Sequence, residues 1–359
     1  MIPFKLERIC MLMHPQAGNA YEAEGVLNPA VARAPDGVLY IFPRLVAKNN
    51  YSRIGIAKVI FDEDGDPVAV ERLGIALEPE ADYEKRPNGN GGCEDPRITF
   101  VEPVQYYIMT YTAYGPNGPR IAMARSKDLL SWERLGLVCF KPTQEVDFNG
   151  IDNKDASFFP ISLPSPHGHE SMAMLHRPLY WDTIPDETVK ASEPRSIDKK
   201  RESIWISYFN LKAGKNTSLE NAQFTSHHCL AQPVEPWEKL KIGAGAPPVN
   251  TKHGWLLVYH GVQNEEGSTK ENPKFCYSAG VMILSDDTPQ KIIYRSKEPV
   301  LSPKLESEKI GTVGNVVFPT GTDRRDDIGQ PNRIDVYYGM ADNKIGVAKM
   351  TIPEHLPKS

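Results

Sequence analysis

Residues 88–97 carry the strongest chemical signal in this sequence. They read Asn-Gly-Asn-Gly-Gly-Cys-Glu-Asp-Pro-Arg and lead directly into the apolar run 98–101. Glycines permit backbone angles that other residues avoid, so the chain can turn sharply here. Pro96 fixes its own φ and favours an extended conformation at Asp95. We therefore expect an acid held at the start of a strand beside Arg97, as catalysis requires. The alternative is a polar turn with a local Asp–Arg pair.

The segments that would position this acid form a five-fold repeat. Five apolar, aromatic-rich segments have the composition of β-strands: 38–42, 106–111, 172–175, 255–259 and 334–338. Each follows a run that opens on a polar or proline-containing corner: 28–30, 95–97, 154–156, 246–248 and 317–319. A third run follows each segment, and a fourth often does. Helical periodicity is nearly absent.

This repeat predicts an all-β chain of antiparallel units with three to four strands each. Radial repetition of four-stranded sheets is the propeller solution to exposed strand edges. We therefore predict a five-bladed β-propeller as a single domain over residues 1–359; a β-sandwich is the alternative. The corners should converge at one mouth of the central channel and bring together Asn28, Asp95, Asp155 and the loops near Pro247 and Pro319. Convergent polar groups in a concavity indicate a binding site.

Composition narrows the classes of protein. The net charge is -5 without a long basic run, which argues against nucleic acid as a partner. No apolar run approaches the roughly 20 residues that cross a bilayer. Five widely spaced cysteines argue against a disulfide framework or a zinc site and favour a reduced, cytoplasmic protein. We interpret Cys93 as a structural thiol. We predict that residues 180–202 form a polar loop insertion in the third blade, and that its basic cluster at 199–201 is a solvated face or contributes to oligomer contacts or substrate access.

Several short segments, taken together, resemble glycoside hydrolase family 130, the β-mannoside phosphorylases and related β-mannosidases. They are Asn-Pro-Ala at 28–30, Phe-Pro-Arg-Leu at 42–45, Ser-Arg-Ile-Gly at 52–55, Cys-Glu-Asp-Pro-Arg at 93–97, Asn-Lys-Asp-Ala at 153–156, Leu-His-Arg-Pro at 175–178, Tyr-His-Gly at 259–261 and Tyr-Gly-Met-Ala-Asp at 338–342. The resemblance covers nearly the whole chain and implies a five-bladed propeller. It also implies that phosphate attacks a terminal β-linked mannose with inversion, which gives α-mannose 1-phosphate.

The resemblance further implies roles for individual residues. Asp95 matches the catalytic acid, which is thought to act through a sugar hydroxyl. The positions expected to hold the mannose are Asn28, Arg44, Arg53, Asp155 and Asp342, although Asp155 could instead orient Lys154 and the two arginines could form ordinary salt bridges. The positions expected to bind phosphate are Lys154, Arg177, Lys241, His260 and Tyr338, because arginine offers a planar fork and lysine a point charge.

Two details of this site follow from the residues themselves. Side chains alternate along a strand, so Glu94 and Asp95 should point to opposite sides and should not form an acid/base pair. Arg97 could serve only to orient Asp95, which would lower the pKa of that carboxyl.

Three functions remain open at this point. An inverting phosphorylase needs cations for its anionic nucleophile, whereas an inverting hydrolase needs a second carboxylate to activate water. The retained cations favour phosphorolysis, and Glu265 and Glu266 keep the hydrolase as the alternative. A non-catalytic glycan-binding propeller is the third option. The sequence shows neither a metal-ligand cluster nor a nucleotide loop, so we expect inorganic phosphate as co-substrate and no organic cofactor. The resemblance is compatible with a homo-oligomer.

Overall fold

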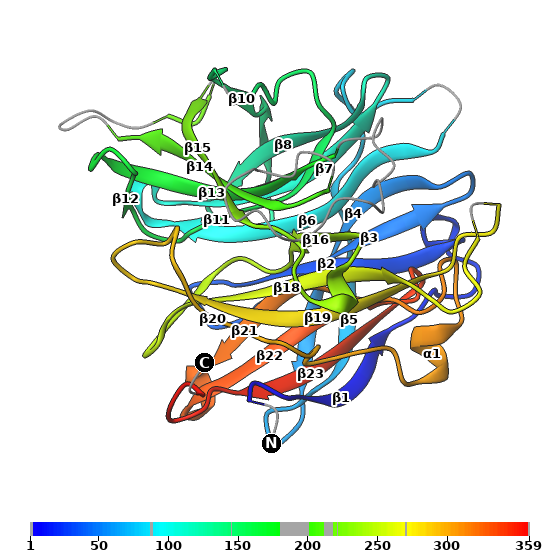
Figure 1. Cartoon of the computed structure of the whole chain (residues 1–359). Coiled ribbons are helices and arrows are strands. Elements are labelled where there is room, and N and C mark those ends of the chain that lie inside the picture. Colours follow the sequence, from blue (N-terminus) through cyan, green and yellow to red (C-terminus); the bar gives the residue numbers. More distant parts are fainter. Residues whose placement is uncertain are drawn as a thin grey trace.

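The computed structural model describes residues 3–86, 89–144, 146–179, 201–211, 218–220, 222–269 and 271–357. Strands dominate these ranges, as Figure 1 shows. The helices within them are one α-helical turn, α1 (Glu306–Lys309), and four 3-10 turns, η1 (Ala20–Glu22), η2 (Glu102–Val104), η3 (Pro236–Glu238) and η4 (Asp326–Ile328). None of the described helices is long and apolar enough to cross a bilayer. The prediction of an all-β chain is confirmed. Of the predicted insertion at 180–202, residues 180–200 lie outside the described residues.

The described strands form five antiparallel groups of four. The first group contains β2 (Gly25–Arg33), β3 (Leu39–Ala47), β4 (Tyr51–Phe61) and β5 (Pro67–Leu77). The second contains β6 (Gly91–Val101), β7 (Tyr106–Gly115), β8 (Gly118–Ser126) and β9 (Glu133–Leu137). The third contains β11 (Asn153–Phe158), β13 (Glu170–Pro178), β14 (Ile204–Asn210) and β15 (Gln223–Ala231). The fourth contains β16 (Lys241–Ala244), β18 (Gly254–Asn264), β19 (Phe275–Leu284) and β20 (Ile292–Arg295). The fifth contains β21 (Val317–Arg325), β22 (Gln330–Met340), β23 (Lys344–Thr351) and β1 (Leu6–Met13). Three short strands pair with these groups: β10 (Cys139–Phe140), β12 (Leu163–Pro164) and β17 (Val249–Thr251).

The chain closes on itself through its two ends. The N-terminal strand β1, dark blue in Figure 1, pairs with the C-terminal strand β23, drawn in red. The first two groups share one sheet, because β4 and β6 form a short parallel pairing through Tyr51 with Gly91 and Ser52 with Gly92. The five predicted apolar segments correspond to β3, β7, β13, β18 and β22, the second strand of each group.

Five hydrophobic clusters fill the spaces between successive groups. One cluster combines residues of the fifth and first groups, including Tyr337, Val347, Val26 and Ile41, all of which are buried. The other four clusters join the first group to the second, the second to the third, the third to the fourth and the fourth to the fifth. Burial of apolar surface between groups, rather than within one sheet, therefore stabilises the arrangement.

Three of the polar corners, 28–30, 95–97 and 154–156, lie inside β2, β6 and β11 as β-bulges and do not open these strands, contrary to our expectation. The corner at 317–319 opens β21 as expected, and the corner at 246–248 follows β16. The register shifts between Leu27 and Ala30 in β2 and between Glu94 and Arg97 in β6. The residue at each bulge has a left-handed backbone, with φ of 44° at Asn28, 47° at Asp95 and 54° at Asp155. Pro96 does not keep Asp95 extended, because the bulge requires a positive φ there. Bulges often re-aim side chains next to active sites.

A buried Glu–Tyr–Arg contact recurs in three of the groups. A glutamate ahead of the first strand accepts two backbone N–H bonds, a tyrosine hydroxyl from the second strand and an arginine from the fourth. The three sets are Glu84 with Tyr111 and Arg134, Glu238 with Tyr259 and Arg295, and Glu308 with Tyr338 and Arg8. In the third group His176 takes the tyrosine's place opposite the bulge and contacts Ser207, with 2.8 Å between Nε2 and Oγ. This repeat assigns Tyr338 a structural contact.

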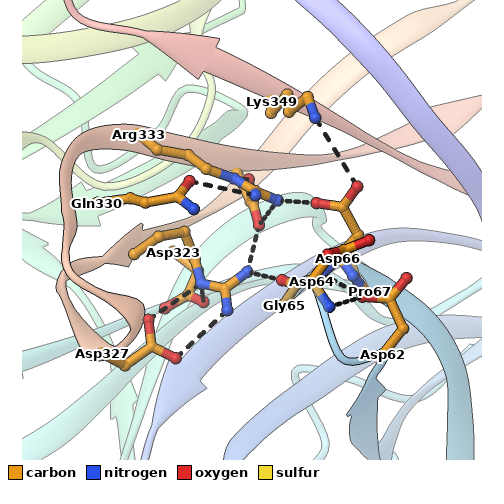
Figure 2. A network of polar contacts seen from close by, with 12 residues as sticks. Asp62, Asp64, Gly65, Asp66, Pro67, Asp323, Asp327, Gln330, Arg333 and Lys349 are labelled. Carbon is orange, nitrogen blue, oxygen red and sulfur yellow. Dashed lines mark hydrogen bonds and ion pairs between the residues drawn. The ribbon is translucent and has the colours of Figure 1, made fainter.

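A second polar network joins the fifth group to the turn between β4 and β5. Figure 2 shows Arg333 extending from β22 to Asp66, which also faces Lys349 on β23. The Nζ atom of Lys349 lies 3.8 Å from Oδ2 of Asp66. Burial raises the pKa of the neighbouring Asp323 to about 6. This network contacts residues near the C-terminal end of β21, whereas the polar cluster described next lies near the start of that strand.

Candidate active site

The bulges of different groups meet at one place, which confirms the expected convergence. Asn28 Nδ2 donates to Asp95 Oδ1 over 2.9 Å, joining the first group to the second. Lys154, beside the third bulge, places Nζ 3.4 Å from Asp95 Oδ2. Thr320 of β21 donates its hydroxyl to the carbonyl of Pro29 over 2.7 Å. These side chains are far apart in sequence, and the closed arrangement of groups brings them together.

Asp95 is a buried carboxylate held by cations. Besides Lys154, Arg44 contacts it, with 3.3 Å between Nη1 and Oδ1. Burial alone would raise the pKa of Asp95, but the charges of Lys154, Arg44 and Arg97 and the hydrogen bond from Asn28 outweigh it. They hold the pKa of this carboxyl well below its usual range, so Asp95 is ionised in the free protein at neutral pH.

Glu94 and Asp95 do not face opposite sides, and the prediction that they would was wrong. Arg44 binds both carboxylates, with Nη2 donating to Glu94 Oε1 over 2.8 Å. The positive φ at Asp95 interrupts the strand alternation on which that prediction rested. Burial raises the pKa of Glu94. Two adjacent carboxylates therefore share one guanidinium, which Ser52 holds by accepting from Nε over 2.9 Å.

Arg97 is a buried clamp between three groups of strands. Its Nη1 donates to the backbone carbonyl of Asp95 over 2.6 Å, and its Nε donates to the carbonyl of Gly245 over 2.9 Å. Its Nη2 lies 3.4 Å from Asp155 Oδ1. Arg97 thus fixes the backbone of the Asp95 bulge and does not pair with its carboxylate. This arginine positions the acid, as one of the sequence interpretations had it.

Asp155 is the centre of a second cluster. Arg177 Nε donates to its Oδ2 over 2.6 Å, and His260 Nε2 lies 3.7 Å from the same oxygen. Burial would raise the pKa of Asp155, but the charges of Arg177, Arg97 and Lys154 hold it well below the usual range. Burial also holds the pKa of His260 well below its usual value, so its imidazole is neutral. Neither ring nitrogen of His260 has a hydrogen-bond partner among the described residues.

Two glycines allow these side chains to approach the strands. A Cβ atom on Gly243 of β16 would lie 2.4 Å from His260 Cε1 and 2.5 Å from Asp155 Oδ2. A Cβ atom on Gly339 would lie 2.0 Å from Asn28 Oδ1. Side chains at either position would displace the polar groups of the site. Asn28 Oδ1 is also buried and has no hydrogen-bond partner within the described part of the chain.

Lys241 lies at the edge of the second cluster, at the first position of β16. Burial, together with the charges of Arg177 and Lys154, lowers its pKa to about 7. Its Nζ is 3.8 Å from Oε1 of Glu202, a carboxylate that also pairs with Arg177. Glu202 is a residue that sequence reasoning missed. It is the last residue of the predicted polar insertion, and no local pattern distinguishes it from the other charged residues there.

Asp342 belongs to the electrostatic surroundings of the acid. It follows β22 with a left-handed φ of 47°. Burial raises its pKa to about 6, the Asp95 and Glu94 charges act in the same direction, and Arg44 opposes them. Its carboxyl is therefore close enough to Arg44, Asp95 and Glu94 to feel their charges.

Arg53 and Tyr338 are not brought into either cluster. Arg53 Nε pairs with Glu78 Oε2 over 2.6 Å, and its guanidinium lies 4.8 Å from the ring centroids of Tyr21 and Tyr51. Its neighbour Ser52 contacts Arg44, so strand alternation directs Arg53 to the other face. Tyr338 donates to Glu308 over 3.0 Å.

The predicted alternative carboxylates also lie elsewhere. Glu265 accepts from Asn315 Nδ2 over 2.8 Å, and Glu266 is exposed. No contact joins either of them to Arg177, Lys241 or His260 within the described ranges. Cys93 is buried in the cluster between the first two groups, as expected of a structural thiol. No group of three or more metal-ligating side chains is present in the described part of the chain.

A cavity of about 740 Å³ lies between the second and third groups. Its lining includes Tyr83, Asn117, Arg120 and Asn153 together with aromatic and aliphatic side chains. Asn153 directly precedes Lys154 in β11, so the cavity reaches the strand that carries the lysine of the site.

The site combines an ionised carboxylate with several cations and with buried polar atoms that have no hydrogen-bond partner among the described residues. Such a site suits a polar substrate together with an anion. Comparisons with known proteins agree. Residues 11–357 match a family model described as beta-1,4-mannooligosaccharide phosphorylase. The chain belongs to glycoside hydrolase family 130.

Characterised relatives cover most of the chain. A 1,2-beta-oligomannan phosphorylase of Thermoanaerobacter sp. (strain X514) is 31% identical over 353 residues, 96% of each chain. A beta-1,4-mannooligosaccharide phosphorylase of Ruminococcus albus is 40% identical over 297 residues, 82% of this chain and 73% of the relative. The solved structure of a beta-1,2-mannobiose phosphorylase from Listeria innocua aligns with a TM-score of 0.69 over 97% of both chains, at 22% identity, and shows the shared fold.

Proposed function

We propose that this protein is an inverting β-mannoside phosphorylase, a hexosyltransferase that moves a terminal β-mannosyl residue to inorganic phosphate. The products are α-mannose 1-phosphate and a shortened sugar. One observation carries the proposal: the buried acid Asp95 lies in the same network of contacts as the cations Lys154, Arg177 and Lys241. Beside them lies a neutral His260, whose ring nitrogens have no hydrogen-bond partner among the described residues. Family membership and the phosphorylase relatives support it.

The two clusters suit the two sides of an inverting displacement. The acid supplies a proton to the leaving oxygen, and the nucleophile approaches from the opposite face of the sugar. We assign Asp95 to the leaving-group side and the Arg177, Lys241 and His260 set to phosphate. Arg177 offers guanidinium donors and Lys241 a point charge, both suited to an oxyanion. Lys154, which contacts Asp95 and lies near Asp155, connects the two sides.

Asp95 must carry a proton when the glycosidic bond breaks, although the free site keeps it ionised. The reaction itself supplies that proton, because the O–H of hydrogen phosphate is lost and a new O–H forms on the departing sugar. A bound dianion near Lys154 would offset the positive charge that lowers the pKa of Asp95. Phosphate binding would therefore favour the protonated acid. The relay through a sugar hydroxyl remains the expected route to the glycosidic oxygen.

The mannose is proposed to lie between the first and fifth groups. Asn28 Oδ1 is a buried acceptor without a partner in the described ranges, and Arg44 and Asp342 lie near the acid. Such groups suit vicinal sugar hydroxyls. We retain Arg53 as a proposed mannose contact, although the present geometry pairs it with Glu78. We propose that Tyr338 serves the fold through its bond to Glu308 and does not bind phosphate.

Hydrolysis is less well supported than phosphorolysis. A hydrolase would need a carboxylate to activate water, and Glu265 and Glu266, the two proposed from sequence, do not contact the cationic cluster within the described residues. The three cations proposed to bind phosphate, Lys154, Arg177 and Lys241, all belong to the two polar clusters. The relatives named above are phosphorylases, but they differ between β-1,2 and β-1,4 linkages. We therefore assign the substrate as a β-mannoside, and we propose that the cavity at Asn153 receives the departing sugar.

We also propose a five-bladed β-propeller, formed as one domain over residues 1–359. Two observations support it: the five groups of four antiparallel strands, and the five hydrophobic clusters that link each group to the next and the fifth to the first. A cytoplasmic location and inorganic phosphate as co-substrate, without an organic cofactor, complete the proposal. The five cysteines are unpaired, which agrees with a reducing compartment.

Product analysis tests the proposal. The protein is incubated with β-1,2- and β-1,4-linked mannobiose, with and without inorganic phosphate, and the sugars are separated by anion-exchange chromatography. We expect mannose 1-phosphate only when phosphate is present. Equal release of free mannose with and without phosphate would indicate the hydrolase, and sugar binding without turnover would indicate a binding module.

A further inference from the structure

Glu202 carries a further inference about the anion side of the site. It lies two residues before β14, and its backbone carbonyl accepts from the N–H of Ile242 over 3.1 Å. The next residue, Ser203, is buried. The position of Glu202 is thus fixed against β16, the strand that begins with Lys241.

The carboxylate of Glu202 pairs with two cations, Arg177 and Lys241, that we assign to phosphate binding. Its Oε2 pairs with Arg177 Nη1, and its Oε1 lies 3.8 Å from Lys241 Nζ. Carboxylate and phosphate oxygens use the same arginine and lysine donors. Glu202 therefore uses donors that a bound phosphate would need.

Glu202 differs from Asp155, the other carboxylate on Arg177. Asp155 is fully enclosed and also contacts Arg97 and His260, so its removal would leave buried charges unpaired. The Glu202 side chain keeps 17% of its surface exposed. It can turn towards water while Asp155 continues to hold Arg177 Nε. Of these two carboxylates, Glu202 is the one that can leave at low cost.

We propose that Glu202 is a built-in competitor of phosphate: its carboxylate occupies part of the anion site in the free enzyme and moves aside when phosphate binds. This inference rests on the proposed assignment of Arg177 and Lys241 to phosphate. A phosphate and an ionised glutamate at the same donors repel one another, so one excludes the other. The return of Glu202 also weakens the hold on the phosphate group of mannose 1-phosphate and so favours product release.

The test compares Glu202→Gln with the wild-type enzyme. Phosphate binding is measured by calorimetry with inorganic phosphate alone, and the phosphate KM is measured with a β-mannobiose as donor. Loss of a partly exposed ion pair that competes with the ligand should lower both the Kd and the KM for phosphate about 5- to 30-fold. Glu202→Asp keeps the charge on a shorter side chain and should give an intermediate Kd.

A matched control is Glu170→Gln, on the same strand as Arg177 but bonded to Ser162 over 2.6 Å and remote from the anion cluster. It should leave the phosphate Kd unchanged within about twofold. Circular dichroism and thermal melting establish that each variant is folded. If Glu202→Gln destabilises the fold, the Glu202→Asp Kd decides the question, and a value equal to or above that of the wild type overturns the proposal.

Other outcomes separate the competing roles. A higher phosphate Kd in Glu202→Gln would show that Glu202 orients Arg177, and an unchanged Kd would show that it does not compete; either result overturns the proposal. Loss of phosphate-independent mannose release with an unchanged Kd would instead make Glu202 a base for water. Failure of the proposed function is distinguishable, because a wild-type protein that binds phosphate but forms no mannose 1-phosphate still allows the Kd comparison.

Discussion

Replacement of Lys241 by arginine tests whether this lysine binds phosphate as a cation. Burial and the neighbouring charges lower the pKa of Lys241 to about 7, so it loses its charge in the free protein as the pH rises above neutrality. With a pKa near 7, the protonated fraction falls about 25-fold between about pH 7.5 and about pH 9. Phosphate is already largely dianionic in this range. If bound phosphate keeps Lys241 protonated, the phosphate Kd should therefore rise by about the same factor.

The assay is calorimetric titration of phosphate at several pH values, each in two buffers with different ionisation enthalpies. The wild-type protein should take up close to one proton per bound phosphate above neutrality. Arginine stays charged throughout this range, so Lys241→Arg should abolish the uptake and flatten the pH dependence. A wild-type Kd that does not change with pH, or the same proton uptake in Lys241→Arg, would refute this account of Lys241.

Four further substitutions test the rest of the site. Asp95→Asn should lower kcat by about 10²- to 10⁴-fold with an unchanged circular dichroism spectrum, because an amide cannot relay the proton; near-normal turnover would remove Asp95 from the mechanism. Asp342→Asn should melt higher than the wild type at pH 8 but not at pH 3, while activity falls. The pKa of Asp342 is raised from 3.8 to about 6, so its ionisation costs stability as the pH rises through that window, by about 1–3 kcal/mol above it; equal melting at both pH values would contradict this. His260→Ala should raise the phosphate KM about 10- to 100-fold through loss of a donor to an anion. Tyr338→Phe should lower the free energy of unfolding by about 1–3 kcal/mol, because the bond to Glu308 is lost. It should change the phosphate KM less than about twofold. If Tyr338→Phe instead raised the phosphate KM and left the melting temperature unchanged, Tyr338 would be a phosphate ligand.

Much of the fold could be predicted because its signals are local. Strand segments such as β7 and β18 are short, apolar and aromatic, and they recur with corners at similar spacing. The order of the short motifs then indicated which corners belong to one site. Asp95, Lys154 and Asp155 were found in this way, and the structure places all three within one network of contacts.

The remaining features depend on contacts between distant residues. The left-handed backbone at Asp95 follows from the bulge, whereas the proline after it favours an extended conformation. Tyr338 was assigned to phosphate because its partners, Glu308 and Arg8, lie on other segments, and Arg8 and Glu308 are 300 positions apart. Glu202 gave no local signal, since only the pairing of β13 with β14 and the packing of β14 beside β16 bring it to Arg177 and Lys241.

The central claim is that phosphate is the nucleophile and attacks with inversion. Proton and phosphorus NMR spectra recorded during the reaction of a β-mannobiose with inorganic phosphate test it most directly. The account predicts that the first product is α-mannose 1-phosphate and that it forms at the rate at which the disaccharide disappears. Free mannose as the first product, or a β-configured mannose 1-phosphate, would contradict the account.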